Sequence, residues 1–169
     1  MRDFTTFLKS YFAGKKDLSG AEIGVYRGEN ADELYREVVP ATFILVDCWT
    51  PKGLGFEVDD KGESAEGFLN TYSLHKDRER VTIIKGWSLE VARFFRDELF
   101  NFIYIDGNHC LEQCRADLWA WYPKVKSKGV FGGHDFNMDG VRQAVEEFFN
   151  GSIITGRGVS GVDWWIVKP

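Results

Sequence analysis

The chain lacks the long hydrophobic runs, the excess of basic residues and the cysteine framework that mark several protein classes. No stretch approaches the roughly 18 uninterrupted apolar residues of a membrane span, and the first residues lack the apolar segment and cleavage site of a signal peptide. The formal net charge of −5 argues against a nucleic-acid partner bound through many phosphate contacts. Three cysteines, Cys48, Cys110 and Cys114, are too few for a disulfide framework. We therefore expect a reducing, cytoplasmic setting and no membrane partner.

Two familiar nucleotide-binding motifs are also missing. The sequence contains neither the G-x-G-x-x-G dinucleotide fingerprint nor the Gly-Lys-Ser/Thr of a P-loop. Cys110 and Cys114 lie four residues apart without the further close thiol or imidazole ligands that zinc needs, so we interpret them as packing residues. What is present is a chain of 169 residues, 44% hydrophobic and 28% charged, which is enough to bury the core of one domain.

Short apolar runs alternate with helix-like stretches. Strands are expected at 21–26, 42–47, 80–85, 101–106 and 129–133, followed by a terminal hairpin at 152–155 and 162–168. The first helix is expected from Asn30 to Val39, because Asn30 and Glu33 have the spacing of a capping box and Pro40 follows. This alternation predicts a single α/β domain over residues 1–169, with a Rossmann-like, doubly wound sheet.

Two segments are candidates for covering the substrate. Residues 49–62 carry proline, glycine and acidic residues and are expected to form a loop insertion. Residues 1–18 are expected to form an N-terminal helix or lid. Their aromatic stretch at 4–12 could pack on the substrate or on a second subunit, so a homodimer is one option.

Candidate ligand-binding residues follow the first three expected strands, since ligands bind at the carboxyl ends of strands in an open parallel sheet. Gly24 and Gly28 allow a tight turn and a close backbone approach. Asp47 ends the next strand roughly twenty residues later, where an acidic side chain can accept hydrogen bonds from ribose. Each feature alone could be an ordinary turn or strand end. Together they favour an adenosine-containing ligand, against which Trp87 could stack, although Trp87 could also be a core residue and Ser88 a helix cap.

Four polar residues follow the fourth and fifth strands. Asp106 and His109 follow one strand, and His134 and Asp135 follow the next, so the topology brings all four to one edge. Two carboxylates can hold Mg²⁺, and a histidine can take up a proton near neutral pH. Any one of these residues could be a hydrogen-bonded strand end, but the set of four favours a reaction site.

These residues together resemble the class I S-adenosylmethionine-dependent methyltransferases, and most closely their small O-methyltransferase-like branch of sugar and natural-product enzymes. The resemblance extends from about residue 20 to residue 168. Its most specific part, residues 103–149, contains IYIDGNH, WYPKVKSKGVFGGHDF and GVRQAVEEFF. It implies a seven-stranded sheet whose final strand, DWWIVK, is antiparallel.

The resemblance also implies roles for particular residues. In more distant metal-dependent catechol-type enzymes, aspartates after the fourth and fifth strands ligate Mg²⁺, and Asp106 and Asp135 hold those positions here. Phe136 stands where those enzymes often supply a further oxygen ligand, and His109 falls close to their catalytic base. The implied cofactor-binding residues are Glu22, Gly24, Tyr26, Gly28, Asp47, Cys48, Gly86, Trp87, Ser88 and Asp106.

We therefore expect methyl transfer from S-adenosylmethionine to a hydroxyl of a small molecule, a sugar or a glycosylated compound. His109 is the first candidate base, with Asp135 or His134 second, and Mg²⁺ or another divalent cation is an optional cofactor. One alternative is a different acceptor, such as an amine, a protein or a nucleobase. Nucleobase methylation is disfavoured because Asp-Gly-Asn-His replaces the usual Asp/Asn-Pro-Pro-aromatic motif. Another alternative is a cofactor-binding or scaffold subunit without activity, and nicotinamide binding is a weaker third one.

Overall fold

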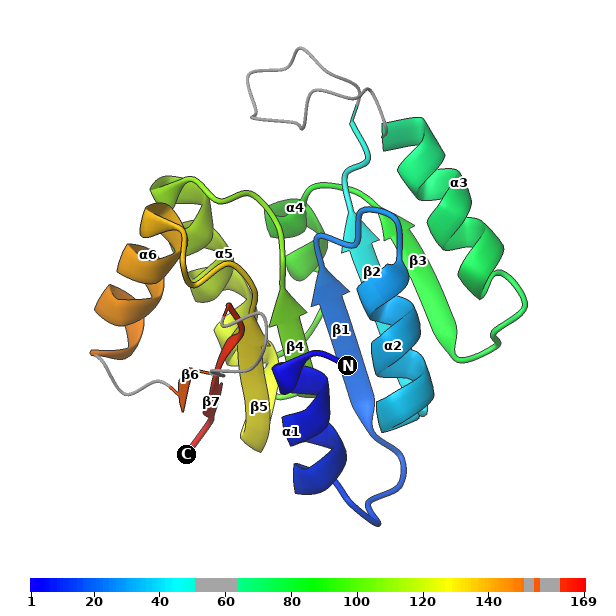
Figure 1. Ribbon diagram of the computed structural model, residues 1–169, viewed down its shortest axis with the longest axis horizontal. Coiled ribbons are helices and arrows are strands. Elements are labelled where there is room, and N and C mark those ends of the chain that lie inside the picture. Colours follow the sequence, from blue (N-terminus) through cyan, green and yellow to red (C-terminus); the bar gives the residue numbers. More distant parts are fainter. Residues whose placement is uncertain (51–63, 151–153, 156–161) are drawn as a thin grey trace.

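The computed structural model describes residues 1–50, 64–150, 154–155 and 162–169 (Figure 1). The predicted loop insertion lies outside the described residues, except for its first two positions. The helices are α1 (Asp3–Tyr11), α2 (Glu29–Val38), α3 (Ser64–His75), α4 (Ser88–Ala92), α5 (Leu111–Trp121), the 3-10 turn η1 (Tyr122–Lys124) and α6 (Asp139–Phe149). The strands are β1 (Ser19–Ile23), β2 (Thr42–Asp47), β3 (Val81–Lys85), β4 (Phe100–Ile105), β5 (Val125–Gly133), β6 (Ile154–Thr155) and β7 (Trp164–Val167). In the described part of the chain, no helix is both long and apolar enough to cross a membrane.

The strands form one sheet in the order β3-β2-β1-β4-β5-β7-β6. The first five strands are parallel, and β7 runs antiparallel to β5. The last position is the short β6, which pairs with β7 through two residues. The predicted Rossmann-like sheet, whose last strand in the sequence is antiparallel, is thereby confirmed. The strand order reverses between β1 and β4, which is the point where open α/β sheets bind their ligands.

Both faces of the sheet are buried under helices. Because successive strand residues point to opposite faces, Ile44 and Val46 pack with α4, α5 and α6, whereas Phe43 and Leu45 pack with α1 and α2. Figure 1 shows these two helical layers on either side of the sheet. Burial on both faces explains why β2 is a continuous apolar run without alternating polar residues.

Helix α1 is part of the core. Phe4, Leu8 and Phe12 are spaced by four residues and are buried together against the sheet. The Phe4 ring lies 4.8 Å from that of Tyr104 and 6.4 Å from that of Trp165. Phe4 and Phe12 are therefore committed to this chain's own interior and do not offer a surface to a substrate or a second subunit.

The prediction of a capping box at Asn30 is wrong. Helix α2 has Gly28 as its N-cap residue, in a left-handed conformation and without a side-chain cap. The amide of Asn30 donates instead to Glu22 Oε1 over 3.1 Å, and Glu33 Oε1 accepts the backbone N–H of Arg2 over 2.7 Å. Contacts with distant residues have therefore displaced the local capping interaction.

Candidate active site

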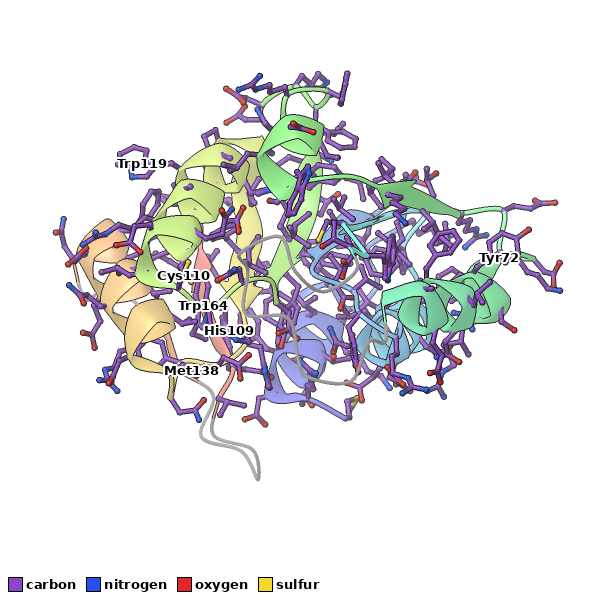
Figure 2. All side chains as sticks on the ribbon, turned by 90° about the horizontal axis from the view of Figure 1, so that it is seen from above. Tyr72, His109, Cys110, Trp119, Met138 and Trp164 are labelled. Atoms are coloured by element: carbon purple, nitrogen blue, oxygen red, sulfur yellow. The ribbon has the colours of Figure 1, made fainter. Side chains whose placement is uncertain are left out.

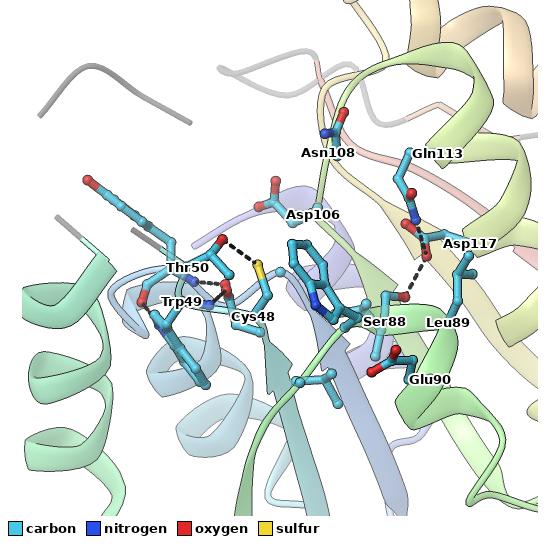
Figure 3. A pocket seen from close by; sticks show the side chains of 18 of the residues that line it. Cys48, Trp49, Thr50, Ser88, Leu89, Glu90, Asp106, Asn108, Gln113 and Asp117 are labelled. Atoms are coloured by element: carbon cyan, nitrogen blue, oxygen red, sulfur yellow. Dashed lines mark hydrogen bonds between the residues drawn. The ribbon is translucent and has the colours of Figure 1, made fainter. Parts of the chain in front are cut away.

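A cavity of about 580 Å³ opens at the carboxyl ends of β1, β2, β3 and β4 (Figure 3). This volume lies within the range of small-molecule sites, roughly 300–1,000 Å³. All the residues expected to contact the cofactor line it except Glu22 and Gly28. Glu22 is buried on β1, and Gly28 precedes α2. The lining also includes residues that sequence analysis did not assign to the site: Trp49, Thr50, Leu89, Glu90, Arg93, Asn108, Gln113 and Asp117.

Gly24 allows two strand ends to approach each other closely. Its φ is +86°, and a Cβ built at this position would lie 2.0 Å from the carbonyl oxygen of Asp106. Its N–H donates to the carbonyl of Val46 over 2.8 Å. The turn thus joins the ends of β1, β2 and β4, and any side chain here would separate them.

We predict that Gly24→Ala lowers the free energy of unfolding by about 3 kcal/mol or more, because backbone strain and the clash with Asp106 add. Gly14→Ala is the matched control, since Gly14 also has a positive φ of +75° but no atom within 4 Å of the added Cβ. That control should lose only about 1 kcal/mol. Urea unfolding of both variants measures the difference, and equal losses would contradict the close approach at Gly24.

Asp47 holds the turn with its carboxylate. Its Oδ2 accepts the backbone N–H groups of Val25 and Tyr26, each over 2.8 Å, and its Oδ1 accepts that of Trp49 over 2.8 Å. Tyr26 and Trp49 both have positive φ values, 51° and 37°, a strained conformation that clusters at functional sites. An ionised carboxylate has about four acceptor positions. The geometry therefore leaves Asp47 the capacity to accept a hydrogen bond from a ligand.

Three side chains form a polar end of the cavity next to α4 and α5 (Figure 3). The hydroxyl of Ser88 donates to Asp117 Oδ1, and Gln113 Nε2 donates to the same oxygen over 3.3 Å. Trp121 Nε1 donates to Ser88 Oγ over 2.8 Å. Because a serine hydroxyl has a single proton, Ser88 can offer a ligand only an acceptor. Ser88 and Asp117 therefore make this end of the cavity an acceptor surface.

Asp117 is a buried carboxyl, with 2% of its surface exposed. Burial raises its pKa to about 6, against which the hydrogen bonds from Ser88 and Gln113 act only in part. The group is therefore mostly ionised at neutral pH and becomes protonated in mild acid. Its position was readable from the sequence, since it lies three residues after Cys114 and four before Trp121, on the buried stripe of α5.

The four polar residues expected at the ends of β4 and β5 do meet. His109 Nε2 lies 2.8 Å from Asp135 Oδ2, and His134 Nδ1 lies 3.1 Å from Asp135 Oδ1. Although burial acts to raise it, the pKa of Asp135 is held well below its ordinary value by hydrogen bonds from the two imidazoles. Asp135 has a positive φ of 57°. Seen from above, His109 lies near the N-terminal end of α5, well separated from Tyr72 on α3 (Figure 2).

Asp106 connects this cluster to the large cavity. It lines both that cavity and a much smaller one, of about 20 Å³, shared with His109, His134 and Asp135. Its Oδ2 accepts a hydrogen bond from Arg2 Nη1 over 3.1 Å, and its Oδ1 lies 3.9 Å from His134 Nδ1. Burial raises the pKa of Asp106.

Asp106, His134 and Asp135 also fit a divalent cation. Each offers one ligand atom, and these atoms lie within 4.8 Å of one another. Carboxylate oxygens and imidazole nitrogens are suitable donors for such ions. His134 joins the two aspartates in this set, whereas sequence analysis considered it only as a base.

Comparison with known proteins supports the fold and the family. A family model described as a methyltransferase domain matches residues 21–136. No curated protein sequence matches the chain. Spermidine synthase from Thermotoga maritima superposes with a TM-score of 0.60 at 20% identity, over 96% of this chain and 57% of that one. The chain thus spans a little over half the length of that enzyme.

Two O-methyltransferases are similar in fold. NovP superposes with a TM-score of 0.68 at 17% identity, over 98% of this chain and 78% of that one. An O-methyltransferase from Bacillus cereus, solved in complex with S-adenosylhomocysteine (SAH), superposes with a TM-score of 0.66 at 16% identity, over 99% and 82% of the two chains. The family model covers more than half of the chain and confirms the resemblance found in the motifs: the chain belongs to a family of methyltransferase domains.

Proposed function

We propose that this chain transfers the methyl group of S-adenosylmethionine to a hydroxyl of a small molecule, with sugars or glycosylated compounds as the acceptor class. One observation carries the proposal. Asp106 lines a cavity of cofactor size and also belongs to the cluster of His109 and Asp135. A methyl donor in the cavity would therefore lie next to a group able to accept a proton.

The cavity suits the parts of S-adenosylmethionine in order. The acceptor surface of Ser88 and Asp117 matches the 6-amino group of adenine, which offers two N–H donors. Trp87 lines the wall nearby and can contact the face of the base. Asp47 retains capacity for a ribose hydroxyl, and the turn at Gly24 with Asp106 borders the space left for the methionine portion.

The reaction needs alignment and one proton acceptor. The bound cofactor supplies a methyl group on a sulfonium, and the acceptor oxygen displaces the thioether in line as the O–C bond forms and the S–C bond breaks. His109 takes the hydroxyl proton, and Asp135 orients its ring and stabilises the imidazolium. Holding the two reacting centres at attack distance provides most of the acceleration. A divalent cation held by Asp106, His134 and Asp135 would also lower the pKa of the acceptor hydroxyl, but proton transfer to His109 does not require one.

Polar residues around Asp106 favour a hydroxyl-rich acceptor. Arg2, Asn108 and His109 surround this part of the site, with their donors and acceptors close together. Such groups can exchange hydrogen bonds with the hydroxyls of a sugar, whereas a flat aromatic acceptor offers few hydrogen-bonding partners.

The test is SAH production from S-adenosylmethionine in the presence of matched panels of glycosides, phenols and amines. We expect SAH to be released above background with hydroxyl acceptors, and the largest release with glycosides. Methylation of amines alone would overturn the hydroxyl assignment. SAH binding without transfer to any panel would favour the scaffold alternative.

A further inference from the structure

Arg2 places a permanent positive charge at the reaction site. Its Nη1 donates to Asp106 Oδ2 over 3.1 Å and to the hydroxyl of Tyr104 over 2.7 Å. The guanidinium stays charged at all working pH values. This ion pair is partly buried, with 31% of the Arg2 side chain and 19% of the Asp106 side chain exposed, so water screens it less than a surface pair.

The surrounding contacts hold Arg2 in place before any ligand binds. Its backbone N–H donates to Glu33 Oε1 over 2.7 Å. The next turn is fixed by the N–H of Phe4, which donates to Asp163 Oδ2 over 3.0 Å. Tyr104 donates to Asp163 Oδ1 over 2.7 Å, and its ring lies 5.6 Å from the guanidinium. The N-terminal segment is therefore tied to α2 through Glu33 and to Asp163, the residue that precedes β7.

The charges at the site are nearly balanced without a metal ion. Asp106 and Asp135 contribute two negative charges, and Arg2 contributes one positive charge. A divalent cation at Asp106 would add two positive charges beside Arg2 and would compete with it for the same carboxylate.

We propose that Arg2 is a positioning residue that supplies, beside Asp106, the positive charge that a divalent cation would otherwise supply. Arg2 holds the carboxylate of Asp106 in place through their ion pair, and it weakens metal binding at Asp106, His134 and Asp135. Methyl transfer by this chain then proceeds without a metal ion. This inference depends on the proposed function for its catalytic part, but its effect on metal affinity can be measured without turnover.

The experiment is Mn²⁺ binding by the full chain, followed by electron paramagnetic resonance of the free ion. We expect weak binding by the unmodified protein and binding at least about tenfold tighter by Arg2→Met, since a charged hydrogen bond is worth about that factor. Arg2→Lys, which keeps the charge, should stay as weak as the unmodified protein. Arg36→Met is the matched control, because Arg36 is 60% exposed and pairs with Asp32 on its own helix. It should change nothing.

Further measurements separate this inference from folding and from the proposed function. A thermal shift with SAH shows whether the Arg2→Met variant is folded and still binds the cofactor. If that variant does not fold, Arg2→Gln takes its place in the experiment. Asp106→Asn added to Arg2→Met should abolish the gained Mn²⁺ affinity. EDTA should leave the activity of the unmodified protein intact. Equal Mn²⁺ affinity with and without Arg2, or activity lost in EDTA and restored by metal, would overturn the inference. Absence of SAH binding would instead count against the proposed function.

Discussion

Replacing His109 with alanine is expected to lower turnover by roughly 10²–10⁴-fold, the usual contribution of a general base. The affinity for SAH should stay nearly unchanged, because His109 lines the small cavity and not the large one. Turnover should fall because His109 is paired with Asp135, which fixes the imidazole ring and stabilises its protonated form. Steady-state kinetics with an accepted substrate and calorimetry with SAH measure the two effects separately.

Cys110→Ala is the control for this experiment, since Cys110 is the exposed neighbour of His109 in the same loop. It should keep both turnover and SAH affinity. If His109→Ala retained full turnover, the proton would have to leave by another route. Asp135→Asn and His134→Ala would then identify the base.

Replacing Asp117 with asparagine is expected to weaken SAH binding by about 10–100-fold while stabilising the free protein. The neutral amide loses the charged hydrogen bond to the 6-amino group of adenine, and its own N–H₂ can face that donor. In the free protein, burial disfavours the ionised form of Asp117 and raises its pKa to about 6. Removing the buried charge should therefore raise the free energy of unfolding at neutral pH by on the order of 2 kcal/mol.

The pH dependence has a definite sign. The folded-state pKa of about 6 lies above the ordinary value of 3.8, so the folded protein binds the proton more tightly than the unfolded chain. Protonation of Asp117 therefore stabilises the folded protein in acid, and this stabilisation is lost as the pH rises through about 6. SAH affinity should change in the opposite direction and fall as the pH drops below 6, and Asp117→Asn should lose much of this dependence.

An analogue of SAH with a keto oxygen in place of the 6-amino group provides a direct test of Asp117. The unmodified protein should reject it, because Ser88 and Asp117 offer only acceptors to its oxygen. Asp117→Asn should reduce the difference in affinity between SAH and the keto analogue. The exposed variant Asp97→Asn, which alters a carboxylate paired with Lys124, is the control. Identical discrimination by all three proteins would show that the base does not bind at this end.

Strand ends were the part of the site that the sequence could predict. Asp47, Asp106 and Asp135 each follow an apolar run, and a parallel topology brings the carboxyl ends of such runs to one edge. The short apolar runs and their alternation with helices carry this information locally. Contact between His109 and Asp135 then follows from the pairing of β4 with β5.

The rest of the site depends on contacts that no local pattern encodes. Arg2 reaches Asp106 across 104 positions of sequence, and its role appears only once α1 packs on the sheet. At Asn30, the capping pattern was present, but a tertiary hydrogen bond to Glu22 used the side chain instead. Asp117 differs from both, because the helical periodicity of α5 already placed this charged residue on a buried face.

Thermal unfolding of the purified chain with and without SAH tests whether the large cavity binds the cofactor. At about a hundred times its dissociation constant, a ligand that binds only the folded state adds roughly 2.7 kcal/mol of stability. For a chain of this size, we expect a rise in Tm on the order of 5–10 °C. An unchanged Tm at millimolar SAH would contradict the assignment of the cavity to the cofactor, and with it the proposed methyl transfer.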